Sequence, residues 1–222
     1  MINGGIMKQY TIGEEIANAI THGIGVIFSI VALVLMVVFA ACFGNAWQVV
    51  SVSIYGSTLI ILYTISTLYH AITNEKAKKV LRIFDHASVY LLIAGTYTPF
   101  TLVVLRQDGA IGWVIFGIVW GVAIIGICLS SILIEKKHTK LQTLLYILLG
   151  WVVVLAFPSI LSVMKANNTL TGVYWLLAGG ILYTAGTVFY IMKKKKFFHS
   201  IWHIFVLLGT VCHFISVMFY VL

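Results

Sequence analysis

The stretch IGVIFSIVALVLMVVFAACF, at residues 24–43, contains no charged side chain and a single hydroxyl group. A helix needs about 20 predominantly apolar residues to cross the hydrocarbon core of a bilayer, and this run has that length. It begins too late and is too long for the apolar core of a secretory signal peptide. The run is therefore predicted to be a retained transmembrane helix.

The rest of the chain repeats this pattern. Short polar interruptions separate six further apolar runs, at residues 47–69, 83–105, 111–134, 144–164, 173–192 and 199–222. Of the 222 residues, 61% are hydrophobic and only 9% are charged, whereas soluble domains carry about 25% charged residues. The sequence excludes a soluble fold. It predicts one all-α domain over residues 1–222, a bundle of seven transmembrane helices with an amphipathic cytoplasmic lead-in at residues 1–22.

The charged residues predict the orientation of this bundle in the cell membrane. The chain has 14 Lys and Arg residues and 6 Asp and Glu residues. Only Arg106 and Lys165 fall on the side opposite the N-terminus. The other twelve form a collar on the N-terminal side: Lys8, Lys76, Lys78, Lys79, Arg82, Lys136, Lys137, Lys140 and lysines 193–196. The positive-inside rule then predicts a cytoplasmic N-terminus and an outer C-terminus. The collar is expected to attract anionic lipid headgroups, so the net charge of +8 does not indicate a nucleic-acid partner.

Five polar residues lie at the predicted cytoplasmic ends of three different spans. Ser66 and His70 end the second span, Asp85 begins the third, and His199 and His203 begin the seventh. Ionisable residues inside spans are costly and indicate functional sites. His199 and His203 are four residues apart and share one helix face, and His70 could complete a set of three. Three neutral imidazoles suit Zn²⁺ and leave a fourth position for water.

The same cluster offers groups for hydrolysis. Asp85 is predicted to act as a base or to orient the water, and Ser66 to hydrogen-bond the water or a substrate oxygen. Histidines are also common at membrane interfaces without binding a metal, so the paired spacing alone is weak evidence. His213 lies ten residues beyond His203, about 15 Å further along a helix, and is not expected to join the site.

A polar stripe precedes the first apolar run. Glu15, Asn18 and His22 are spaced three and four residues apart, so they share one helix face. Two interpretations remain open. The stripe either lies in the lipid headgroups as the polar face of an interfacial helix, or it caps the predicted metal site from the cytoplasmic side.

Several motifs resemble those of the hemolysin III family, within the progestin and adiponectin receptor (PAQR) family of seven-helix proteins. They cover nearly the whole chain in the family order: EEIANAITHGIG at 14–25, STLYH at 66–70, Asp85-His86, AGTYTPF at 94–100 and HSIWH at 199–203. The resemblance implies zinc held by His70, His199 and His203 near the cytoplasmic face. It further implies that Asp85 helps to hold a zinc-bound water, and that Ser66 matches the family serine.

The resemblance also implies two classes of function. The wider superfamily includes alkaline ceramidases, which implies a zinc-dependent hydrolase of lipid amides, active in membrane lipid homeostasis on an acyl-chain substrate. The alternative is a non-enzymatic protein with structural zinc, either a sensor of membrane lipids or a cytolytic, haemolytic pore former. Because folds host unrelated activities, the fold and the metal transfer better than the reaction does.

Overall fold

The computed structural model describes residues 10–135, 139–192 and 195–222, and in these ranges it contains helices and no strand. Within these ranges, seven segments are long and apolar enough to cross a membrane, which confirms the predicted all-α bundle of seven spans. The α-helices are α1 (Ile12–Phe43), α2 (Ala46–Ala71), α3 (Glu75–Pro99), α4 (Ile111–Glu135), α5 (Thr139–Gly150), α6 (Phe157–Ala166), α7 (Thr171–Ile191) and α8 (Phe198–Tyr220). Of the predicted basic collar, Lys8, Lys136, Lys137 and lysines 193–194 lie outside the described residues.

Side-chain caps define where the first helices begin. Thr11 and Glu14 form a capping box, in which the Thr11 hydroxyl accepts from the Glu14 N–H at 3.3 Å and the Glu14 carboxylate accepts from the Thr11 N–H at 3.0 Å. Asn45 and Gln48 form a second box at the start of α2, and Asn74 caps α3. Capping satisfies N–H groups that have no partner inside the helix. The turns between these helices are short, so neighbouring spans run antiparallel.

Two spans contain irregular turns. After Pro99, α3 passes into a π-helical turn at Phe100–Val104 and a 3-10 turn at Leu105–Asp108. Proline lacks the N–H that would bond to the carbonyl four residues earlier. In the same turn the Thr101 hydroxyl donates to the Tyr97 carbonyl at 3.0 Å. In the fifth span, a 3-10 turn at Trp151–Ala156 separates α5 from α6.

The first helix has its apolar side outward and its polar side inward. Its buried stripe includes Asn18, His22 and Ser29, whereas Ile16 and Ile20 are exposed. The helix runs without a break from Ile12, so residues 12–22 of the predicted lead-in continue directly into the first span. Its 32 residues give a length of about 48 Å, which exceeds the roughly 30 Å hydrocarbon core. The polar stripe thus faces the protein interior, where α1 packs against α2 and α8.

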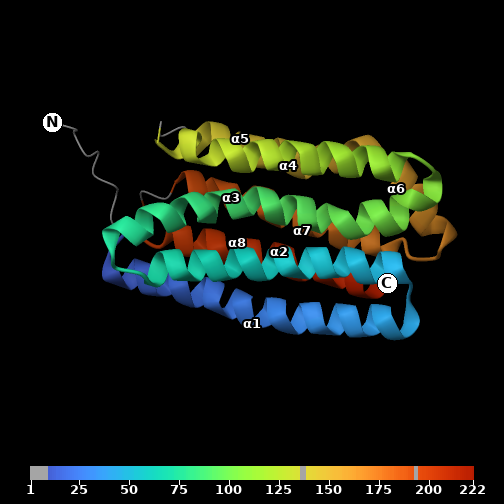
Figure 1. The fold of residues 1–222 in the computed structure, drawn as a ribbon, viewed down its shortest axis with the longest axis horizontal. Coiled ribbons are helices and arrows are strands. Elements are labelled where there is room, and N and C mark those ends of the chain that lie inside the picture. Colours follow the sequence, from blue (N-terminus) through green and yellow to red (C-terminus); the bar gives the residue numbers. More distant parts are fainter. Residues whose placement is uncertain (1–9, 136–138, 193–194) are drawn as a thin grey trace.

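The order of the spans brings distant parts of the sequence to one end of the bundle. Successive spans run in opposite directions, so the start of α1 and the end of α8 lie at opposite ends of the molecule (Figure 1). The end of α2 and the starts of α1, α3 and α8 meet at the end shown on the left (Figure 1). These four helix termini carry the candidate site.

Candidate metal centre

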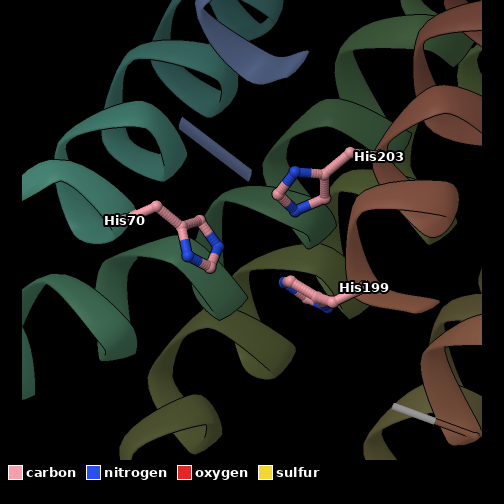
Figure 2. Close-up of side chains that lie close together, drawn as sticks. All are labelled: His70, His199 and His203. Carbon is pink, nitrogen blue, oxygen red and sulfur yellow. The ribbon is translucent and has the colours of Figure 1, made fainter. Parts of the chain in front are cut away.

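Three histidines from two helices converge at this end of the bundle. His70 comes from the last turn of α2, and His199 and His203 come from the first turns of α8. Figure 2 shows the three rings pointing into a common space between the two helices. Their ring centroids are 4.5 to 5.2 Å apart, and one nitrogen from each ring lies within 4.8 Å of the others. All three are buried, so the predicted convergence is observed.

A carboxylate on α1 orients the first of these rings. His70 Nδ1 lies 2.6 Å from Glu15 Oε2, and Lys78 Nζ lies 2.6 Å from the other oxygen of the same carboxylate. An ionised carboxylate only accepts, so Nδ1 carries the proton and Nε2 presents its lone pair. Asn18 Nδ2 lies further from Nδ1, at 3.4 Å, while its Oδ1 accepts from the Ser200 hydroxyl at 2.6 Å. Carboxylate–histidine pairs of this kind are usual behind metal-binding imidazoles.

Backbone and hydroxyl oxygens of α1 orient a second ring. His203 Nδ1 lies 3.2 Å from the Asn18 carbonyl and 3.1 Å from Thr21 Oγ1. The Thr21 hydroxyl proton is itself donated to the Ala17 carbonyl at 2.9 Å, so both oxygens act as acceptors. His203 Nδ1 therefore carries the proton, and Nε2 is left as the nitrogen that can bind a metal.

Tyr10 covers the cluster at the end of the bundle. Its ring stacks on His199, with centroids 5.2 Å apart and an interplanar angle of 18°, and lies 6.0 Å from the His70 ring. Burial raises the pKa of the Tyr10 phenol, so the hydroxyl keeps its proton at neutral pH. The cluster is thus enclosed by an aromatic ring as well as by α1.

The donor set fits a metal ion. His70 Nε2 is fully buried, and it has no hydrogen-bond partner in the described part of the chain. Leaving a buried polar atom unpaired costs about 1–3 kcal/mol, and a metal bound at this lone pair removes that cost. Neutral imidazole nitrogens suit Zn, Cu, Ni and Fe. The three histidines could therefore hold a metal ion.

A cavity of about 150 Å³ adjoins the cluster and carries the other predicted site residues. Ser66, Asp85, His199 and His203 are among its lining residues, and its walls are mostly apolar. The Asp85 carboxylate is not among the converging ligand atoms, and it lies 3.6 Å from His86 Nδ1. The cavity continues along α8 to His213, which lies apart from the cluster, as the helix spacing predicts.

The structure supports one interpretation of the polar stripe and adds residues that sequence reasoning missed. Glu15 and Asn18 contact His70, so this face of α1 lies against the histidine cluster. Glu14 is also buried, and its Oε1 accepts from the Phe197 N–H at 3.1 Å, just before α8 begins. Tyr10 and Thr21 were not predicted. The four-residue spacing of Glu14, Asn18 and His22 is the signal that could have indicated Glu14.

These observations define a class of protein: a multi-pass protein of the cell membrane, with a buried three-histidine cluster beside an apolar cavity. A sequence model of the family described as "Haemolysin-III related" matches residues 10–214. The chain belongs to this family.

Named relatives extend this result. The chain is 47% identical over 212 residues to the "Hemolysin-3 homolog" of Bacillus subtilis (strain 168), with 96% of each chain covered. It is 46% identical over 216 residues to the "Hemolysin-3" of Bacillus cereus, covering 97% of this chain and 95% of that one. The human "Monocyte to macrophage differentiation factor" is 27% identical over 210 residues, covering 92% and 83%. This more distant similarity fits the predicted placement in the PAQR family.

Proposed function

We propose that this protein is a zinc-dependent hydrolase of lipid amides, with His70, His199 and His203 as the metal ligands. The observation that carries the proposal is the convergence of three buried imidazoles, two of which, His199 and His203, line a mostly apolar cavity. Zinc held by three neutral nitrogens supplies a Lewis acid and makes water a nucleophile near neutral pH. This donor set supports zinc over Mg²⁺ or Ca²⁺, which prefer oxygen ligands.

The chain's own residues supply the remaining steps. Hydrolysis adds water across the amide C–N bond, so that oxygen joins the acyl carbon and a proton goes to the leaving amine. Asp85 lines the cavity and is suited to accept the proton of the attacking water. Ser66 Oγ is buried and has no hydrogen-bond partner among the described residues, so its hydroxyl can donate to the substrate oxygen. The apolar walls, which include Leu62, Val89 and Val206, suit an acyl chain.

Measuring the free fatty acid that the purified protein releases from ceramide tests this proposal. The wild type is expected to release fatty acid, and Asp85→Asn is expected to lose at least about 100-fold in rate, since general acid–base groups typically contribute 10²–10⁴-fold. Metal content is expected to stay unchanged, because Asp85 is not among the converging ligand atoms. A control is Asp108→Asn at the opposite end of the third span, which is expected to keep full activity. Absence of hydrolysis across a panel of lipid amides would contradict the proposal.

A second candidate function rests on the names of the two bacterial relatives, both of which contain the word hemolysin. In this alternative the protein lyses membranes, or senses their lipids, and the metal joins α2 to α8 structurally. Leakage of a dye from liposomes containing the purified protein separates it from the hydrolase. Leakage that persists in Asp85→Asn, together with no fatty-acid release, would favour the cytolytic alternative.

A further inference from the structure

His22 is a buried histidine that the proposed mechanism does not use. Its side chain lies on α1, one turn beyond Asn18, and it is 4% exposed. Both ring nitrogens are fully buried, and neither has a hydrogen-bond partner in the part of the chain that the structure describes. Buried polar atoms are nearly always hydrogen-bonded in native proteins, and an exception calls for an explanation.

Packing holds the His22 ring in place but gives its nitrogens no hydrogen-bond partner among the described residues. His22 stacks on His203, with centroids 3.5 Å apart and an interplanar angle of 16°. It meets the edge of the Tyr63 ring at 5.1 Å and 87°. The ring is therefore held between two aromatic neighbours. Its nitrogens do not belong to the group of ligand atoms that His70, His199 and His203 bring together.

The open space beside this ring is the cavity. His22 lines it together with Ser66, whose hydroxyl is also unpartnered among the described residues. These two polar side chains, unpartnered among the described residues, thus line a mostly apolar cavity whose walls include Leu62, Leu92 and Val206, together with Asp85 and several hydroxyl groups. A ligand with an apolar chain and an uncharged polar group complements both the apolar walls and the unpartnered His22 and Ser66. A neutral imidazole offers one donor and one acceptor, which matches an amide.

We propose that His22 is a substrate-binding residue, whose imidazole hydrogen-bonds the amide group of an acyl lipid in this cavity. The inference rests on the proposed function, because it assigns a polar contact for the same class of substrate. It makes a separate claim, since it concerns recognition of the amide and not cleavage. His22 therefore selects lipids with a polar linkage over plain alkyl chains.

The test compares two probes of equal chain length, palmitamide and hexadecane, binding to the purified protein in detergent. His22→Phe keeps an aromatic ring for stacking and removes both nitrogens. We expect palmitamide to bind about tenfold more weakly to this variant, as the loss of a hydrogen bond worth about 1.4 kcal/mol predicts. We expect hexadecane affinity and metal content to stay at wild-type values. Partitioning of each probe into micelles is common to all variants, so it cancels in the comparison.

Two further variants provide controls. His213→Phe makes the same change at the far end of the cavity, where Nδ1 already donates to the Gly209 carbonyl at 2.8 Å. It is expected to leave the preference for palmitamide over hexadecane unchanged. His22→Gln restores a donor and an acceptor and is expected to recover most of that preference. If His22→Phe does not fold, His22→Leu takes its place.

Three results would overturn the inference. Equal weakening of both probes would mean that His22 only fills space. Loss of the metal would mean that His22 acts by orienting His203. A wild type with no preference for palmitamide would mean that the cavity does not recognise the amide. Failure of this inference can be told apart from failure of the proposed hydrolase. Palmitamide binding that depends on His22, without fatty-acid release, would contradict only the hydrolase. Fatty-acid release, with an unaltered palmitamide preference in His22→Phe, would contradict only the role of His22.

Discussion

At the scale of single residues, Glu15 connects the histidine cluster to the basic end of the bundle. Its two oxygens contact different partners, His70 Nδ1 and Lys78 Nζ, each at 2.6 Å. The carboxylate therefore fixes the ring and the tautomer of His70, while the lysine compensates the negative charge. Partners of this kind orient a metal-binding imidazole and raise its basicity, so their loss weakens metal binding.

Glu15→Gln is expected to weaken metal binding about 10–100-fold, the usual effect of losing such a partner. The amide cannot accept from His70 Nδ1 with the strength of a carboxylate, because the charge assistance is lost. Titration of the purified protein with a competing chelator measures the affinity. Glu75→Gln, in the first turn of α3, is the matched control and is expected to keep wild-type affinity. An unchanged affinity in Glu15→Gln would contradict the assigned role.

The three histidines that converge could be predicted from sequence, but the residues that orient their rings could be predicted only in part. His70, His199 and His203 stand out because a histidine is rare in an apolar run, and the alternation of spans puts all three at one depth. The roles of Glu15 and Asn18 depend on how α1 rotates against α2 and α8, which the spacing left open. The contact between Glu14 and Phe197 joins residues 183 positions apart, and no local pattern indicates it.

At the scale of helices, close approach of α1 and α2 depends on small residues. Gly25 lies against the Tyr63 ring, so an added methyl group there would overlap the ring atoms. Tyr63 is fully buried and its hydroxyl lies 2.8 Å from Thr210 Oγ1, so the ring has little freedom to move. Because Tyr63 also meets the edge of His22, a shift of this ring reaches the candidate site.

Gly25→Ala is expected to destabilise the protein by about 1–3 kcal/mol, the usual cost of overpacking a filled core. Gly117→Ala is the matched control on α4, since no described atom outside the local backbone of its own helix and its two chain neighbours lies within 4 Å of the added carbon. The control is expected to be neutral or to gain up to about 1 kcal/mol, because alanine favours helix more than glycine does. Thermal unfolding in detergent measures both variants. Equal melting temperatures for Gly25→Ala and the wild type would contradict the close packing.

Apolar length predicts the helices well, but not their internal irregularities. Seven runs of about 20 residues indicate seven spans. The π-helical turn after Pro99, and the 3-10 turn that divides α5 from α6, leave the composition of those spans unchanged. They change the backbone hydrogen bonding of the turn, where the Phe100 N–H and the Thr101 hydroxyl both donate to the Tyr97 carbonyl, and composition does not indicate such bonds.

At the scale of the whole molecule, we propose that the metal centre lies at the cytoplasmic end. Lys78 and Arg82 lie near the start of α3, and Lys195 and Lys196 lie just before α8, so they share the end of the bundle that carries the site. Arg106, after α3, and Lys165, in the last turn of α6, lie at the opposite end. The positive-inside rule assigns the basic end to the cytoplasm.

Reporter fusions in a bacterial host test this orientation. Alkaline phosphatase fused after Leu222 is expected to be active, because the enzyme needs export, while a green fluorescent protein at the same position is expected to stay dark. Both reporters fused after residue 137, in the predicted cytoplasmic connection, provide the reverse control. An inactive phosphatase and a fluorescent protein at the C-terminus would show that the chain has the opposite orientation and would contradict the proposed topology.

The central claim is that His70, His199 and His203 hold one zinc ion, and metal analysis of purified protein tests it most directly. We expect about one zinc per wild-type chain and its loss in His70→Ala, His199→Ala and His203→Ala, because each variant leaves only two of the three ligands. His213→Ala, outside the cluster, is expected to keep the metal. Stoichiometric zinc in all three ligand variants, or a wild type that binds no metal, would contradict the account.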